Sequence, residues 1–229
     1  MIVGQDFLVA SPVRSCRALL LLMPTPGFWA AIAGSAARIA SGFGLACVAG
    51  VMGAALAAAI PLVDALLTPL VRAIRSVPVM SFIILVLLWA SSSRLSLIVS
   101  FLMVLPVIYI NVHEGIAARD TSLLEMADVF GVPTGRRLLP LQVPQVLPFF
   151  LAGARLAVGL AWKSGVSAEV IGLPHGSIGE RLYQAKLFLN SADLFAWTVV
   201  IIALSYLFER VLFALFGLGR RRLGTVLDR

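Results

Sequence analysis

The chain has 229 residues, of which 60% are hydrophobic and 13% are charged, and its formal net charge is +7. A water-soluble domain normally carries about 25% charged residues, so this composition excludes an ordinary soluble domain and indicates a chain surrounded largely by lipid. A positive charge of this size can indicate nucleic-acid binding. Here, however, the arginines lie between apolar runs, which is the pattern of membrane-protein loops. We therefore expect the lipid bilayer, and no nucleic acid, as a partner.

Residues 1–24 form an N-terminal segment whose relation to the membrane the sequence leaves open. Its apolar run, residues 18–23, follows Arg14 and Arg17 and is itself followed by Pro24. A secretory signal would also need a small-residue cleavage site, and no convincing one is present. The segment is therefore a possible short first transmembrane helix, or the end of a helix that starts further upstream.

Five apolar stretches follow, and each is a candidate span because about 20 apolar residues cross the hydrocarbon core. They cover residues 43–60, 77–90, 95–112, 146–164 and 195–216. The first is rich in Gly and Ala, which is typical of helices that pack closely in lipid. Pro106 is expected to break the third stretch, and Gly217 is expected to mark the end of the fifth, before the basic residues 220–222.

The arginines predict the orientation, since positively charged loops tend to stay in the cytoplasm. With a cytoplasmic C-terminus, two connections are also cytoplasmic: residues 64–76, which contain Arg72 and Arg75, and residues 118–144. The sequence thus predicts an all-α integral membrane protein, multi-pass, with five to six transmembrane helices. One transmembrane domain covers residues 25–229.

The connection of residues 118–144 is much longer than a tight turn and has helix signals of its own. Ser122 is expected to cap a first helix, with Glu125 at the spacing of a capping box. Gly131 is expected to end that helix, and Thr134 to cap a second short helix that Pro144 closes. Periodicity alone leaves two roles open for this hairpin: docking into the groove of a partner protein, or resting on lipid.

A second pattern runs through the same connection. Glu125 is followed by Met126, Ala127 and, six residues after Glu125, by Gly131; later come Leu141, Val143 and Pro144. These residues resemble the EAA loop of ABC-type importer permeases, which reads Glu-Ala-Ala, three residues, Gly, nine residues and Ile-x-Leu-Pro. Met126, Leu141 and Val143 are conservative departures from it. Patterns elsewhere, such as Arg75-x-Val77-Pro78, resemble the nitrate/sulfonate/taurine branch of these permeases.

The resemblance implies the type I importer permease fold, with the EAA loop (residues 118–144) as a cytoplasmic coupling-helix hairpin. It implies a homodimer of permeases, two ATP-binding subunits that dock on the EAA loops, and an extracytoplasmic substrate-binding protein. The location implied is the bacterial cytoplasmic (inner) membrane. The substrate implied is a small anion, such as nitrate, a sulfonate or taurine, or a pyrimidine-type precursor.

This chain is not expected to be an enzyme or to hold a cofactor or metal. The phosphate-binding pattern GxxxxGK[ST] is absent from its sequence, so ATP and Mg are expected in the partner ATPase. A different class of protein, a stand-alone secondary transporter with a site formed by broken helices, stays open as the alternative.

Polar residues inside the apolar stretches are candidates for the translocation pathway, because ionisable groups are costly in the membrane. The candidates are Asn111, Arg155, Trp162, Lys163 and Glu169. Arg155 is expected to reach toward the cytoplasmic face. Lys163 is expected either to pair with an acidic neighbour such as Glu169 or to offer its charge to an anionic substrate.

Overall fold

The computed structural model describes residues 11–227, and for residues 134, 136, 138, 139 and 218–227 it describes the backbone alone. The described residues are helical and contain no strand, as the sequence predicted. The helices are α1 (Pro12–Leu22), α2 (Pro26–Ala59), α3 (Pro61–Ser76), α4 (Val79–Leu87), α5 (Ser92–Ala117), α6 (Thr121–Val129), α7 (Thr134–Arg137), a π-helical turn (Leu138–Gln142), α8 (Val143–Gly172), α9 (Ile178–Leu187) and α10 (Ser191–Leu227).

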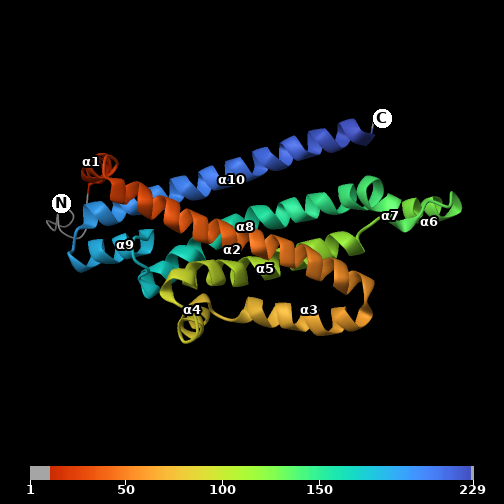
Figure 1. Cartoon of the computed structure of the whole chain (residues 1–229), viewed down its shortest axis with the longest axis horizontal. Coiled ribbons are helices and arrows are strands. Elements are labelled where there is room, and N and C mark those ends of the chain that lie inside the picture. Colours follow the sequence, from red (N-terminus) through yellow and green to blue (C-terminus); the bar gives the residue numbers. More distant parts are fainter. Residues whose placement is uncertain (1–10, 228–229) are drawn as a thin grey trace, which may run out of the picture.

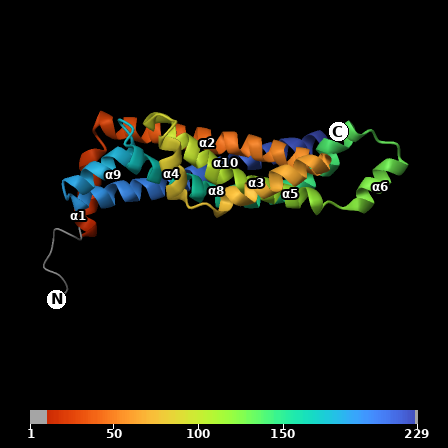
Figure 2. The ribbon, with the colours of Figure 1, turned by 90° about the horizontal axis from the view of Figure 1, so that it is seen from below.

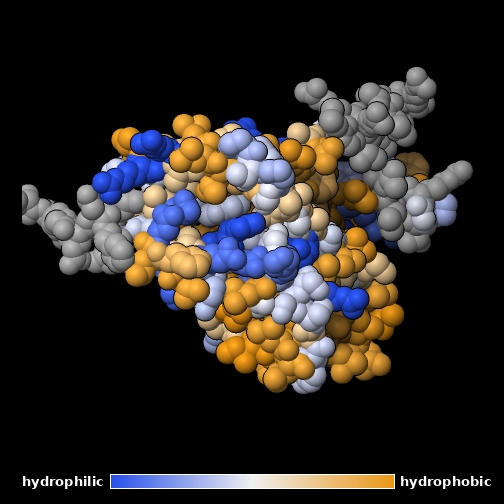
Figure 3. Space-filling view, turned by 60° about the vertical axis from the view of Figure 1, so that its left-hand side comes forward, coloured by the Kyte–Doolittle hydropathy of each residue, from blue (hydrophilic) through white to orange (hydrophobic). Residues whose placement is uncertain are grey.

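The long helices α2, α5, α8 and α10 run along the longest axis of the molecule (Figure 1). Helix α6 and the C-terminus lie at one end, which we call the loop end. Helices α1 and α9 lie at the opposite end, the far end (Figures 1 and 2). Figure 3, turned to bring the far end forward, shows hydrophilic side chains gathered in the middle of the view with hydrophobic side chains around them. This arrangement suits a bundle whose flanks contact lipid and whose ends contact water.

Four helical segments within residues 11–227 are long and apolar enough to cross a membrane: Pro26–Ala59, Ser92–Ala117, Pro140–Gly172 and Ser191–Gly217. Helices α3 and α4 form a fifth if they are counted as one broken span, because they are bent by 100° relative to each other. Helix α1 has 11 residues, a length of about 16 Å, which is too short to cross the hydrocarbon core. Residues 1–10 lie outside the described part of the chain.

Two predicted helix ends are wrong. Pro106 lies within α5, a continuous helix of 26 residues, and does not break it, because neighbouring helices can compensate for the missing backbone donor in a membrane helix. Helix α10 continues past Gly217 to Leu227, since one glycine costs a helix only about 1 kcal/mol. Proline and glycine therefore mark a helix end less reliably inside a bundle than in an isolated segment.

The core of the bundle is formed by α2, α5 and α8, which approach each other closely at small residues. A Cβ atom added at Gly42 of α2 would lie 2.3 Å from the backbone oxygen of Leu97, and one added at Gly165 of α8 would lie 2.6 Å from Ile39. The expectation that the Gly- and Ala-rich stretch packs against neighbours is confirmed. Helix α10 packs less deeply, because only 6% of the residues in its apolar 18-residue stretch are buried.

The close approach at Gly42 predicts a clear difference between two glycines of the same helix. Gly42→Ala is expected to destabilise the bundle by about 1–3 kcal/mol through overpacking, because the new methyl group would meet the backbone of α5. Gly44→Ala is the matched control, since nothing lies within 4 Å of the added Cβ. SDS-induced unfolding in mixed micelles measures both variants, and equal stability of the two would contradict the observed packing.

Candidate functional site

The EAA loop begins at the loop end with a well-capped helix. Asp120, not Ser122, is the N-cap of α6: its carboxylate accepts hydrogen bonds from the backbone N–H and the hydroxyl of Ser122, at 2.9 and 2.6 Å. The prediction of Ser122 as the cap is therefore wrong. Asp is at least as good a cap as Ser, and here the serine hydroxyl is already engaged as a donor. The Ser122 hydrogen bonds hold the pKa of Asp120 below its ordinary value.

Helix α6 ends as predicted, just before a glycine whose backbone is in the left-handed conformation. Gly131 has a φ of +63°. Its N–H donates to the Asp128 carbonyl, and the N–H of Val132 donates to the Ala127 carbonyl, both at 3.0 Å. This pair of bonds is the Schellman motif, and it reverses the chain sharply after Phe130.

The motif residues of α6 divide between an inner and an outer side. Ala127 is buried, whereas Glu125 and Met126 are exposed. Val129 and Phe130 at the end of the helix are 85% and 76% exposed. Exposed apolar side chains next to a carboxylate form a surface that a second protein or a lipid surface can cover.

The second half of the EAA loop differs from the prediction. No separate short helix is closed by Pro144: α7 passes through the π-helical turn directly into α8, whose first turn contains Pro144. Proline is tolerated there because the first turn of a helix does not need its N–H. Leu141 and Val143 are half-buried. The predicted cap at Thr134 involves a side chain outside the described residues.

The EAA loop is fixed at its turn and at its base by side-chain bonds. At the turn, the Arg137 guanidinium donates to the Asp128 carboxylate and the Val132 carbonyl. At the base, Arg119 donates to the Gln142 side chain at 2.9 Å. These bonds join the two halves of the hairpin and connect the end of α5 to the start of α8. The hairpin is thus tied to the adjoining ends of α5 and α8.

A cavity of about 530 Å³ lies where α5, α8 and the break between α3 and α4 meet. Its polar lining residues are Arg75 of α3, Asn111 of α5 and Lys163 of α8, and the rest of the lining is mostly aliphatic. The structure thus brings two of the predicted pathway residues, Asn111 and Lys163, into one site. Arg75 joins them although it was placed in a cytoplasmic connection, because residues 64–76 belong to a helix that runs along the bundle (Figure 1).

Two smaller hollows continue from this cavity toward the loop end. The first, about 360 Å³, shares Arg75 and Ile110 with the cavity. The second, about 340 Å³, shares His113 with the first and reaches Arg119 at the base of the EAA loop. At their junction the His113 Nε2 atom lies 3.2 Å from an Asp64 carboxylate oxygen. Neighbouring hollows thus share lining residues between the base of the EAA loop and the middle of the bundle.

Arg155 and Trp162 face α10 and do not line the cavity. The Arg155 guanidinium lies over the Phe213 ring, with its Nε atom 4.0 Å from the Glu209 carboxylate. Trp162 is buried, with its ring 6.2 Å from that of Phe208. Both side chains are thus accounted for by packing against α10. Their role in the translocation pathway stays a prediction, because neither residue lines the cavity.

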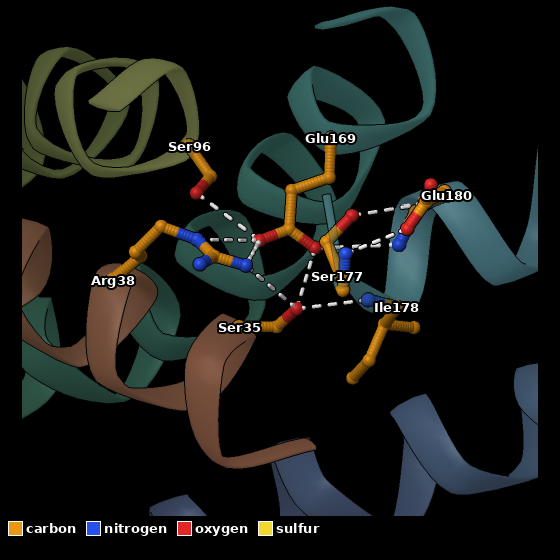
Figure 4. Close-up of polar contacts among 9 residues, drawn as sticks. Ser35, Arg38, Ser96, Glu169, Ser177, Ile178 and Glu180 are labelled. Atoms are coloured by element: carbon orange, nitrogen blue, oxygen red, sulfur yellow. Dashed lines mark hydrogen bonds and ion pairs between the residues drawn. The ribbon is translucent and has the colours of Figure 1, made fainter. Parts of the chain in front are cut away.

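Glu169 belongs to a buried polar cluster near the far end (Figure 4). Its carboxylate accepts from the Arg38 guanidinium at 2.8 Å, from the Ser35 hydroxyl at 2.6 Å and from the Ser96 hydroxyl at 3.2 Å. The backbone N–H of Gly179 donates to it at 3.3 Å. The cluster joins α2, α5, α8 and the start of α9 through one fully buried carboxylate.

The predicted pairing of Lys163 with Glu169 is therefore wrong, since Arg38 of α2 is the partner. Sequence reasoning missed Ser35 and Arg38 because they lie more than 130 residues from Glu169 along the chain. A signal was present: Arg38 stands three residues after Ser35 in an otherwise apolar helix, and a charge inside a membrane helix requires a partner.

Comparison with known proteins confirms the resemblance that the EAA loop suggested. A family described as "Binding-protein-dependent transport system inner membrane component" matches residues 46–224. The "Putative aliphatic sulfonates transport permease protein SsuC" of Bacillus subtilis is 31% identical over 71% of this chain and 59% of that protein. The "Bicarbonate transport system permease protein CmpB" of Synechocystis is 27% identical over 63% of this chain and 51% of that protein. The alignments thus span between half and three fifths of these relatives.

The fold has a match among solved structures. The "Crystal structure of an amino acid ABC transporter with histidines" superposes with a TM-score of 0.58 at 17% sequence identity, over 84% of this chain and 94% of that chain. The identity is low, so this likeness supports the fold alone. Because the family match covers most of the chain, this protein belongs to the family of binding-protein-dependent transport system inner membrane components.

Proposed function

We propose that this chain is the membrane-spanning permease subunit of an ATP-driven importer, which forms the substrate pathway and couples to a separate ATP-binding subunit. The observation that carries the proposal is the EAA hairpin. It stands off the loop end of the bundle (Figure 2), exposes Val129 and Phe130, and matches the spacing of the EAA motif, with conservative replacements at Met126, Leu141 and Val143. A lipid surface could cover such a hairpin, but it would not require the Glu125, Gly131 and Pro144 spacing.

The geometry supports a defined route from the hairpin to the pathway. The EAA loop connects α5 to α8, and both of these helices line the cavity of about 530 Å³. Because Arg119 and Arg137 brace the loop, a displacement of α6 by a partner subunit would be transmitted to both cavity walls. Closing and opening of two ATP-binding subunits would then widen or narrow the pathway between two permease copies.

The remaining parts of the assembly follow from this proposal. ATP and Mg would be bound by the partner ATPase, a second permease copy would complete the pathway, and an extracytoplasmic binding protein would deliver the substrate. The loop end and the C-terminus would face the cytoplasm of a bacterial inner membrane. The two relatives are named for aliphatic sulfonates and bicarbonate, which favours a small anion over a pyrimidine-type precursor. Both are named as permease proteins, so nothing favours a stand-alone secondary transporter.

Cysteine cross-linking tests whether the hairpin contacts an ATP-binding subunit. In a chain whose Cys16 and Cys47 are replaced by Ser, we expect Phe130→Cys to cross-link to the co-expressed ATP-binding subunit, because Phe130 is 76% exposed on the hairpin. Trp89→Cys is the matched control: it is 85% exposed but lies between α4 and α5, at the far end.

Labelling with a membrane-impermeant maleimide gives the orientation in the same two variants. We expect Phe130→Cys to react only after the membrane is opened and Trp89→Cys to react in intact cells. Reaction of Phe130→Cys from outside intact cells would overturn the proposed function, since no cytoplasmic ATPase could reach the hairpin.

A further inference from the structure

Two cations from different helices line the same cavity. Arg75 comes from the end of α3 and Lys163 from α8, and no acidic side chain occurs among the described residues that line the cavity. Within residues 11–227 neither cation has an ion-pair partner. By contrast, Arg38 pairs with Glu169 and the Arg155 guanidinium approaches Glu209. Neither positive charge is therefore neutralised by an ion pair, although Glu114 lines the adjoining hollow that Arg75 also lines.

Both charges lie well away from the ends of the bundle, on side chains that are exposed in the single chain. Lys163 precedes the end of α8 by nine residues, which corresponds to about 13 Å of helix. Arg75 follows the start of α3 by 14 residues, or about 21 Å. Cations at such depth are costly unless they face water or an anion. This depth also distinguishes them from loop arginines, which reach lipid headgroups at the membrane surface.

The rest of the cavity suits a small ligand with polar oxygens. The Asn111 amide donates one N–H to the Val107 carbonyl at 2.8 Å, which leaves its second N–H to donate. Gly153 makes room for this side chain, because a Cβ there would lie 2.9 Å from Asn111. Gly159 leaves space, since nothing lies within 4 Å of a Cβ added to it. Apolar walls with few convergent polar groups are typical of small-molecule sites.

We propose that this cavity binds a small oxyanion, with Arg75 and Lys163 as its counter-charges and Asn111 as a hydrogen-bond donor. Two sources share this chemistry: a free oxyanion, such as a sulfonate, and the phosphate of a lipid headgroup. The depth of the charges favours the free oxyanion. Its role as a stopping point along the transport pathway rests on the proposed function, whereas the binding itself can be measured on this chain alone.

The test is a ¹⁹F NMR titration of the purified full-length chain in phosphatidylcholine nanodiscs. The probe is trifluoromethanesulfonate, and methyl trifluoromethyl sulfone is its neutral counterpart. We expect the wild type to broaden the signal of the sulfonate and not of the sulfone. Arg75→Gln and Lys163→Gln should each weaken sulfonate binding by about tenfold to a hundredfold, the usual effect of removing a charged hydrogen-bond donor.

Three further variants separate charge, space and folding. Lys163→Arg should retain binding because it retains the charge, and Gly159→Phe should abolish it by filling the cavity with all charges present. Lys186→Gln is the control: it removes an exposed cation of α9 that does not line the cavity, and it should bind as the wild type does. Equal binding by the wild type, Arg75→Gln and Lys163→Gln would overturn the proposal, as would equal binding of the neutral sulfone.

Adding phosphatidylglycerol to the nanodiscs distinguishes the two sources. Unchanged sulfonate binding supports the free oxyanion. The lipid reading has two signs: sulfonate binding is lost, and native mass spectrometry finds phosphatidylglycerol on the wild type but not on Lys163→Gln. Together they would assign the cavity to a lipid and overturn the free-oxyanion proposal. Because no ATPase is present, these outcomes are independent of the cross-linking test of the proposed function.

Discussion

Replacement of Glu169 by Ala is expected to destabilise the protein by about 3–5 kcal/mol, the usual cost of leaving one member of a buried ion pair without its partner. Glu169 is fully buried and accepts from Arg38, Ser35, Ser96 and the Gly179 backbone. Its loss would leave the Arg38 guanidinium uncompensated and would remove the Gly179 hydrogen bond that helps to hold the start of α9. SDS-induced unfolding in mixed micelles measures the change.

A double-mutant cycle tests whether the pair itself is the cause. Arg38→Met combined with Glu169→Met is expected to be more stable than either single variant, because apolar side chains of similar volume can replace a buried ion pair. Glu125→Ala is the control, since this carboxylate is exposed. Additive effects of the two Met substitutions would show that Arg38 and Glu169 do not act as a pair.

Gly131→Val is expected to reduce uptake by about tenfold or more while leaving membrane insertion intact. A left-handed conformation costs an ordinary residue about 1–2 kcal/mol, and a β-branched residue is a genuine outlier there. The chain would therefore leave the observed turn at φ +63° and redirect the exposed end of α6. A loss of tenfold corresponds to about 1.4 kcal/mol, so the strain alone is large enough to produce it.

Gly135→Val provides the matched control for this experiment. Gly131 and Gly135 lie four residues apart in the EAA loop, and neither has an atom within 4 Å of an added Cβ. Only Gly131 has a positive φ. Uptake in cells and ATP hydrolysis by the reconstituted complex should thus distinguish the two variants. Full coupled transport by Gly131→Val would show that the geometry of the turn is not needed for docking.

Local signals in the sequence determined the class of the protein and the position of its EAA loop. The apolar stretches predicted the membrane helices, because hydrophobic length is a property of each segment by itself. Gly131 was predicted as a helix end for an equally local reason, since its backbone conformation disfavours other residues. Local reasoning failed where neighbouring helices compensate for a defect, since Pro106 lies in an unbroken helix. It also missed that Asp120, two residues before Ser122, caps α6.

Only the tertiary structure decided which charges meet. The partner of Glu169 is Arg38, 131 residues away, and no spacing along the chain distinguishes it from Lys163. Arg75 was read as part of a surface connection, but the α3 helix carries it to the cavity that Asn111 and Lys163 also line. The physical reason is the same in both cases. Composition and periodicity describe one helix at a time, whereas an ion pair or a cavity depends on how several helices pack together.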